Sequence, residues 1–456
     1  MNKRNNDKKR SVLKKVLISI GSILIIAIAA ASIYWFSIPK GQRNMLTFMM
    51  FSGGNYDNYE VSQVIDRNEV DFEPTTYIPV AAETSETDHN QNIAVVTEML
   101  QNESSSMLKG AYVQTIGVED YTGWHFLADE GAAEGEYPYG PSPLSYYTTG
   151  VATNLHTQIL YASDALAVEL DDVKVEVVNK FRWNQMSSDN GTGHTDTTKT
   201  SVIIESSASE EAVQSVIDLA FNAWAAGEAL ANKTTIEPQL VINGENWNNY
   251  NLRAVTSLSD ESVVDGFMIS SVTDKTIYPE TIELALNEEQ GMSLSSMDNM
   301  EFEIYAISES ANNSDRPQLK KATISTPSGE SWEIYSDEFM SEDDTPLAPT
   351  SLEYFTAGTA LCLTSQTTLV SAMMDLDFTE YRVENQTDYR EENINSDKMV
   401  SYADTVHSYV LIESDESKER LEEFYNKSLS LCFAGEGLSQ ETEMITTFYL
   451  NNKELK

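Results

Sequence analysis

Four segments place hydrophobic residues three and four positions apart, which is the spacing of a helix with one buried face. They cover residues 142 to about 163, 209–224, 350–362 and 417–435. Each opens with a serine or a threonine, and these side chains satisfy the free N–H groups of a first helical turn. In the third segment Glu353 stands three residues after Thr350, so the two residues are expected to form a capping box.

Shorter segments rich in β-branched residues predict strands around these helices. They lie at residues 93–99, 111–117, 124–127, 173–178, 200–204 and 236–242. The polar segment 189–196 resembles a calcium loop only faintly, because it lacks a terminal glutamate at the right distance, and a hairpin turn is expected there. Strands alternating with helices predict an α/β (α+β) fold.

The same order of segments recurs 208 positions later. This separation relates Trp124 to Trp332 and Gly150 to Gly358, and it continues through the later helices. A constant offset over such a length predicts a tandem duplication of a domain of roughly 150 residues. We expect one domain at residues 90–245, a connecting segment at 246–297 and a second domain at 298–456.

The N-terminal segment has the composition of a membrane anchor. Residues 1–15 are strongly basic, and residues 16–36 are almost wholly apolar. About twenty such residues span a bilayer, and the basic flank favours a cytoplasmic N-terminus. We therefore expect a single-pass protein of the cell membrane, a juxtamembrane spacer at 37–89 and extracytoplasmic domains. A cleaved signal peptide ending near residues 29–31 is the alternative.

The net charge of the chain limits the kinds of partner that it can bind. Nine of the 29 basic residues but one of the 72 acidic residues precede residue 44, so the rest of the chain carries a net charge near −51. Because nucleic-acid binding needs basic patches, no nucleic-acid partner is expected. High solubility at a cell surface is the simplest reading of this acidity.

Conventional cofactor and metal motifs are not recognised in the sequence. Neither a serine-centred elbow nor a phosphate-binding glycine loop is found. The histidines show no metal-ligand spacing: they are His89, His125, His156, His194 and His407. We expect no cofactor and no metal.

Both cysteines belong to the second copy. Where that copy has Cys362 and Cys432, the first copy has Asn154 and Trp224. Two residues that differ together between the copies suggest a functional pair. In an exported chain a structural disulfide or two inert thiols is the competing reading.

Four features of the second copy resemble the OsmC/Ohr family, the osmotically induced and organic-hydroperoxide-resistance proteins. They are the hairpin segment 322–329, the helix opening 349–354 that leads to Cys362, the later helix with Cys432, and the closing strand at 444–450. The first copy shows the same helix opening at 140–146, without cysteines. The resemblance covers about residues 90–245 and 298–456.

This resemblance implies two central helices against antiparallel sheets, and here an intrachain pseudo-dimer of the two copies. It implies a peroxidase that reduces an organic hydroperoxide and is recycled by an unknown dithiol reductant. Cys362 is then the attacking thiol and Cys432 the resolving thiol. The family places an arginine near the attacking thiol and holds it with a glutamate, for which Glu353 is the candidate.

The sequence leaves the basic partner of Cys362 open. The position aligned with the family's arginine holds Leu319, and the nearby candidates are Arg316, Lys320 and Lys321. Lysine lacks the planar fork of arginine, so the alternative is a catalytically degenerate surface or ligand-binding protein with a structural cysteine pair.

Overall fold

The computed structural model describes residues 43, 65–67, 89–99, 107–118, 123–130, 140–243, 269–273, 276–284, 292–296, 299–326, 331–339, 345–376, 378, 380–393 and 396–455. The membrane anchor expected at residues 16–36 lies outside these ranges. Within them, no helix is both long enough and apolar enough to cross a bilayer.

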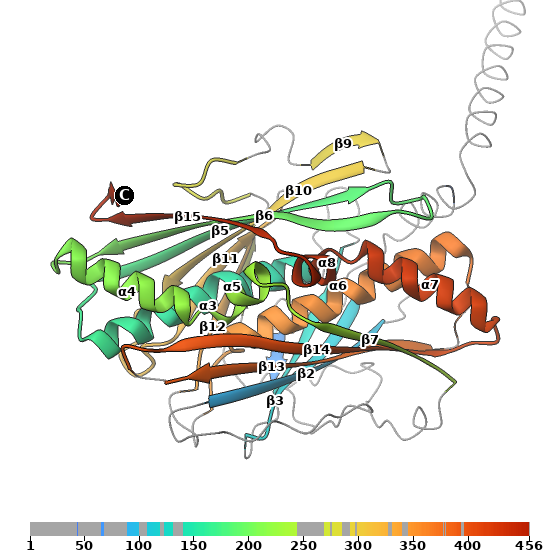
Figure 1. Ribbon diagram of the computed structural model, residues 1–456, viewed down its shortest axis with the longest axis horizontal. Coiled ribbons are helices and arrows are strands. Elements are labelled where there is room, and N and C mark those ends of the chain that lie inside the picture. The colour runs from blue at the N-terminus through green and yellow to red at the C-terminus, as the bar shows by residue number, and fades with distance from the viewer. Residues whose placement is uncertain are drawn as a thin grey trace, which may run out of the picture.

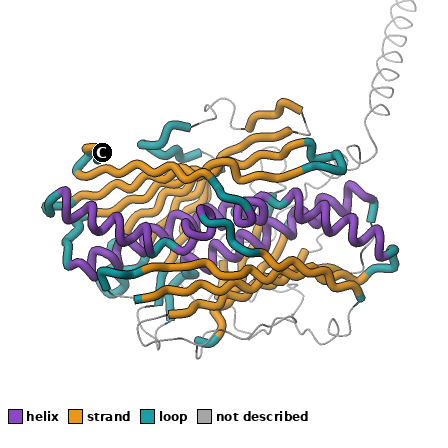
Figure 2. The backbone as a smooth tube through the Cα atoms, in the orientation of Figure 1, coloured by secondary structure: helices purple, strands orange, loops and turns teal. Residues whose placement is uncertain are grey.

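A layer of helices lies between two β-sheets (Figures 1 and 2). The described residues form six helices: α3 (Pro143–Leu166), α4 (Glu210–Asn222), α5 (Ala225–Ala231), α6 (Ser351–Met374), α7 (Lys418–Leu431) and α8 (Phe433–Ser439). The expectation of a mixed α and β protein is confirmed.

The first sheet has seven described strands in the order β1-β4-β3-β2-β13-β14-β7. Their bounds are β1 (Ile65–Arg67), β4 (Trp124–Ala128), β3 (Lys109–Ile116), β2 (His89–Met99), β13 (Glu380–Glu392), β14 (Val400–Glu413) and β7 (Ile236–Ile242). β7 pairs with β14 in parallel, and the other neighbours are antiparallel.

The second sheet repeats this plan. Its order is β16-β15-β6-β5-β10-β11-β12-β8, and β9 pairs with β10 beside this path. The bounds are β16 (Lys453–Glu454), β15 (Glu443–Leu450), β6 (Thr192–Glu205), β5 (Asp172–Asn184), β10 (Asn299–Ser310), β11 (Lys320–Ser325), β12 (Ser331–Ser336), β8 (Ile269–Thr273) and β9 (Met292–Ser296). Each sheet therefore takes strands from both parts of the chain.

The described elements recur at the offset seen in the sequence. The bounds of α6, β13 and β14 are those of α3, β5 and β6 moved by 208 residues. The first hairpins differ, because Lys109 pairs with Ala128 in one sheet and Lys320 pairs with Ser336 in the other. Along β3 and β11 the offset is therefore 211, and three residues separate the lengths of the two hairpins. The expected domain boundaries themselves stay a prediction.

The predicted helices are confirmed, with one correction. The segment 417–435 forms two helices instead of one, and the break falls at Cys432, whose extended backbone (φ −74°, ψ 110°) ends α7 and begins α8. The strands at 173–178 and 200–204 extend into a long hairpin, since antiparallel pairing continues to the turn before Thr192. The segment taken as a spacer contains β1, which pairs with β4.

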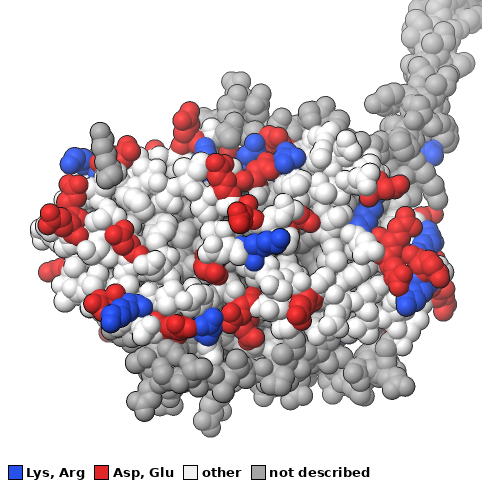
Figure 3. Space-filling view, in the orientation of Figure 1, with Lys and Arg blue, Asp and Glu red and all other residues white. Residues whose placement is uncertain are grey.

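Charge is mixed on the face of the molecule shown in Figure 3. Acidic and basic side chains are interspersed there, and acidic side chains gather at the end that α7 occupies in Figure 1. Glu422 and Glu423 of α7 are exposed, and Glu422 forms an ion pair with Lys418 at one helical turn. A surface of this kind agrees with solubility as the role of the charge.

The core is centred on the packing of α3 against α6. A Cβ atom on Gly150 would lie 2.5 Å from the backbone nitrogen of Phe355, and one on Gly358 would lie 2.3 Å from that of Tyr147. The rings of Tyr147 and Phe355 stack with their centroids 4.8 Å apart. Two glycines at equivalent positions thus let the two helices approach closely.

This contact predicts the effect of one added methyl group. Gly358→Ala should lower the melting temperature, although alanine favours an isolated helix by about 1 kcal/mol over glycine. The cause is the clash with the Tyr147 backbone, and overpacking of this kind costs about 1–3 kcal/mol. Thermal unfolding is the measurement, with Glu422→Ala on exposed α7 as the control that should change little. An unchanged or raised melting temperature for Gly358→Ala would contradict the close helix contact.

Candidate functional site

The structure brings the two cysteines together. Their sulfurs lie 3.6 Å apart, and the second is the Sγ of Cys432 at the junction of α7 and α8. Both are free thiols, with 1% and 2% of their surface exposed. A disulfide has an S–S length near 2.05 Å, so a small movement of either side chain would allow a bond.

Cys432 is held by the start of α8. Its Sγ accepts a hydrogen bond from the backbone N–H of Gly435 at 3.3 Å, so a cysteine takes the role of the N-cap residue. The extended backbone at this position turns the sulfur back over the first turn of α8. The break between the two helices is therefore what aims the thiol toward α6.

Cys362 lies in an environment that favours its neutral form. Burial raises the pKa of this thiol well above its usual value, followed by Cys432 and the negative charge of Glu130. The backbone N–H of Ala434 acts in the opposite direction. Because a thiolate is the attacking species in thiol chemistry, the resting thiol needs a proton acceptor before it can react.

The first half fills the equivalent positions with polar and aromatic groups. The side-chain oxygen of Asn154 accepts the Ala226 N–H at 3.1 Å, and its amide donates to Ser351 Oγ at 3.2 Å. Trp224 donates from Nε1 to the carbonyl of Val151 at 3.2 Å. Asn154 thus accepts from α5 the hydrogen bond that Cys362 accepts from Ala434 of α8 in the second half. In the first half this contact packs the two helices together.

Glu353 lies at the start of α6 and is fully buried. It completes the expected capping box by accepting the Thr350 N–H at 2.9 Å while Thr350 Oγ1 accepts the Glu353 N–H at 3.2 Å. Its other oxygen accepts both the N–H and the hydroxyl of Thr115 on β3, at 3.1 and 3.0 Å. The carboxylate therefore fastens the cysteine-bearing helix to a strand of the first half.

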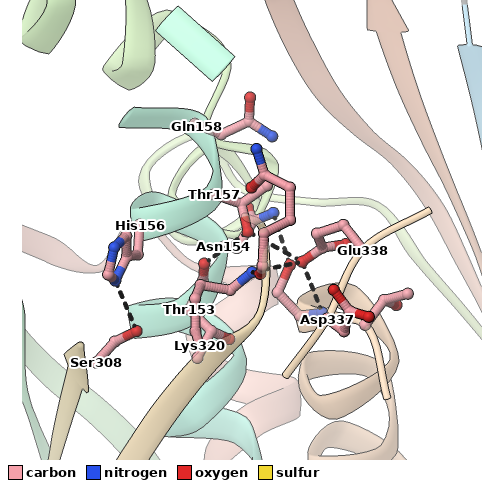
Figure 4. A network of polar contacts seen from close by, with 12 residues as sticks. Thr153, Asn154, His156, Thr157, Gln158, Ser308, Lys320, Asp337 and Glu338 are labelled. Carbon is pink, nitrogen blue, oxygen red and sulfur yellow. Dashed lines mark hydrogen bonds and ion pairs between the residues drawn. The ribbon is translucent and has the colours of Figure 1, made fainter. Parts of the chain in front are cut away.

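The three basic candidates pair with acids of their own half. Arg316 Nε donates to Asp337 at 2.8 Å. Lys320 Nζ lies 3.5 Å from Glu338 Oε1, and Lys321 Nζ lies 3.1 Å from Glu333 Oε1. These contacts lie on the β11–β12 side of the second sheet. Lys320 is fully buried, and burial together with the charge of Lys320 lowers the pKa of His156 on α3 to about 3. Figure 4 labels Lys320 in the polar network that it forms with Glu338.

A different ion pair, formed by residues of the first half, contacts the helix that carries Cys362. Lys109, fully buried at the start of β3, forms an ion pair with Glu130 at 2.8 Å. The same carboxylate oxygen accepts the hydroxyl of Ser365, which lies one turn after Cys362 on α6. Sequence analysis missed this group, because the offset of 208 sets Lys320 against Tyr112, whereas the observed strand register sets it against Lys109.

Tyr147 of α3 was also missed. Burial raises the pKa of its hydroxyl well above the usual value, with further contributions from Cys362 and Cys432. Its counterpart at the offset of 208 is Phe355. The signal in the sequence was this single added hydroxyl in the half that lacks the thiols.

A dense polar network from both halves surrounds α3, the central helix without cysteines (Figure 4). Glu338 Oε1 accepts Thr157 Oγ1 at 3.0 Å and the Ser351 N–H at 3.2 Å. Gln158 donates to Glu391 at 3.1 Å. Burial and the neighbouring Glu338 charge raise the pKa of Glu391 to about 7.

Glu391 should make stability depend on pH. A carboxyl whose folded pKa is raised contributes its stability fully below the unfolded value and loses it as pH rises to the folded pKa, here between 4.5 and about 7. Glu391→Gln should therefore stabilise the protein above pH 7, by up to about 3 kcal/mol, and change it little at pH 4. Urea unfolding at both pH values measures this, with exposed Glu422→Gln as the control. Equal pH dependence in Glu391→Gln and wild type would contradict the assignment.

Comparison with known proteins gives little. No protein-family model matches the chain, and no curated protein matches it. Among solved structures, an OsmC-like hydroperoxide resistance protein from Jannaschia sp. CCS1 aligns with 16% identity over 30% of this chain and 88% of its own length. The TM-score of 0.23 is too low for this likeness to support a conclusion about the chain.

Proposed function

We propose that this chain is a thiol-dependent organic hydroperoxide reductase in which Cys362 attacks and Cys432 resolves. The observation that carries the proposal is the 3.6 Å separation of the two sulfurs across three helices. An attacking thiol needs a second thiol within reach to convert its oxidised form into a disulfide. The pair also lies in one half only, at positions where the other half has neither thiol.

The chemistry balances with an external dithiol. The sulfur of Cys362, as thiolate, attacks the terminal oxygen of the hydroperoxide, the O–O bond breaks, and the products are a sulfenic acid and an alcohol. The thiol of Cys432 then attacks the sulfenic sulfur, the S–O bond breaks, and water leaves as the disulfide forms. A dithiol reductant returns both thiols in exchange for its own oxidation.

We also propose an OsmC-like architecture for the two halves, at residues 90–245 and 298–456, joined as an intrachain pseudo-dimer. Two central helices between two sheets that exchange strands support this, as does the recurrence of α3 as α6 at an offset of 208. The sequence of residues 16–36 supports a membrane anchor that places both halves outside the cell. The substrate then meets the protein before it reaches the cytoplasm.

Glu353 has a positioning role in this proposal. It holds the first turn of α6 to Thr115 of β3. The same strand begins at Lys109, which is joined to α6 through Glu130 and Ser365. The glutamate therefore sets where the strand carrying Lys109 lies against the helix carrying Cys362. It acts through these contacts and not on the substrate.

A structural thiol pair is the second candidate. Its supporting observation is burial: both sulfurs are nearly inaccessible, and the raised pKa of Cys362 disfavours the attacking thiolate. On this reading the two thiols, or the disulfide they form, stabilise the contact between α6 and the α7–α8 junction.

The two candidates differ in how the reduced protein meets peroxide. With stoichiometric cumene hydroperoxide, wild type should lose both thiols together, because the first oxidation is followed by disulfide formation. Cys432→Ser should accumulate a sulfenic acid at Cys362 that dimedone labels, and Cys362→Ser should keep its remaining thiol. Thiol counting and mass spectrometry of the labelled peptide measure these outcomes.

Thiols that stay reduced in wild type while the protein remains folded would reject the reductase. A disulfide that forms only with strong oxidants and raises the melting temperature would then support the structural pair. Labelling of Cys432 in the Cys362→Ser variant, at the wild-type rate, would reverse the assigned roles.

A further inference from the structure

The ion pair of Lys109 and Glu130 crosses from the first half to the thiol helix of the second. Glu130 Oε2 accepts from Lys109 Nζ at 2.8 Å and from the hydroxyl of Ser365 on α6. Lys109 Nζ also donates to the carbonyl of Met107 at 2.7 Å, which fixes the ammonium group at the start of β3. The half without cysteines thus brings a carboxylate to within one helical turn of Cys362.

Two properties suit Glu130 to exchange protons with this thiol. Its charge is felt at the sulfur, because it contributes to the raised pKa of Cys362. Its side chain is also 29% exposed, whereas that of Lys109 is fully buried, so the carboxylate can exchange protons with solvent. The other titratable groups around the sulfur are Cys432, whose Sγ lies 3.6 Å away, and Tyr147, whose hydroxyl has a pKa raised well above its usual value by burial.

A matching set lies around α3, a helix that carries no thiol. Lys320, Glu338 and Thr157 are the counterparts of Lys109, Glu130 and Ser365, and Glu338 accepts from both Lys320 and Thr157. Glu338 also accepts the Ser351 N–H, and its side chain is only 8% exposed. There the carboxylate is closed in and anchors a helix terminus, so this second set shows what the arrangement does as structure alone.

We propose that Glu130, positioned by Lys109, accepts the proton of Cys362 as the sulfur attacks the hydroperoxide and returns that proton to the departing alkoxide. The S–O bond forms as the O–O bond breaks, the alkoxide leaves as the alcohol with the returned proton, and the carboxylate is regenerated. This inference rests on the proposed reductase. Proton transfer by a positioned side chain contributes about 10²–10⁴-fold to a rate.

Glu130→Gln separates this role from a purely electrostatic one. A carboxylate that only raises the pKa of the thiol would slow every reaction of Cys362, so its removal would speed both peroxide oxidation and alkylation by iodoacetamide. If Glu130 instead accepts the proton, its removal slows the oxidation by peroxide. Glu130→Gln should then oxidise at least about tenfold more slowly at pH 7, while alkylation stays equal or becomes faster.

The experiment uses the full chain, reduced, with single-turnover oxidation by cumene hydroperoxide and alkylation of Cys362 followed from pH 5 to 9. Glu338→Gln is the matched control in the polar network around α3, a helix without cysteines, and should keep the wild-type rate and pH profile. Lys109→Met combined with Glu130→Gln removes both charges, which avoids an unpaired buried ammonium, and should resemble Glu130→Gln. Melting temperatures confirm that each variant is folded.

Three results would overturn the inference. They are an unchanged oxidation rate and pH profile in Glu130→Gln, a rise in both of its rates, or an equal loss in Glu338→Gln. If wild type alkylates but never reduces the peroxide, the proposed function itself fails. A reductase that works equally well without Glu130 would reject the role of Glu130 alone.

Discussion

The close packing of α3 against α6 is the contact on which the rest of the structure depends. Glycines at equivalent positions, Gly150 and Gly358, leave room for the backbone of the opposite helix, and Tyr147 stacks on Phe355 across the interface. Because both sheets pack on this helix layer and exchange strands, neither half encloses its own core. Cys362 lies one turn beyond Gly358, so the same contact places the thiol in the shared interior, where the groups around it come from both halves.

Burial at this position has opposing consequences for chemistry. It keeps the two sulfurs at 3.6 Å in a fixed arrangement, yet it removes the water that would stabilise a thiolate. A protein can resolve this conflict with a nearby cation or with a proton acceptor. The group that reaches the thiol helix is an ion pair whose acid contacts Ser365 and whose cation, Lys109, lies behind it. The proposed reductase therefore relies on proton transfer to this acid and not on direct stabilisation of the thiolate by positive charge.

The two halves have diverged within one framework. Where the second half has two thiols, the first has Asn154 and Trp224, whose hydrogen bonds reproduce contacts between the central helix and the short helix that follows. The buried lysine and glutamate are retained in both, but Glu338 anchors the start of α6 while Glu130 remains open to solvent. One framework thus holds a structural network around α3 and the two thiols between α6 and the α7–α8 junction.

The sequence by itself determined the helices and most strands, because hydrophobic spacing, capping residues and β-branched segments act locally. It also predicted the recurrence at 208 and suggested that Cys362 and Cys432 act as a pair, since both depend on residue identity at fixed positions, but only the fold brings the two sulfurs to 3.6 Å. It could not identify Lys109 and Glu130 as neighbours of the thiol helix, because strand exchange brings them there from the other half and the hairpin register shifts by three residues. The break at Cys432 was likewise decided by tertiary structure, because the first half has the same break at Trp224, where no thiol is present.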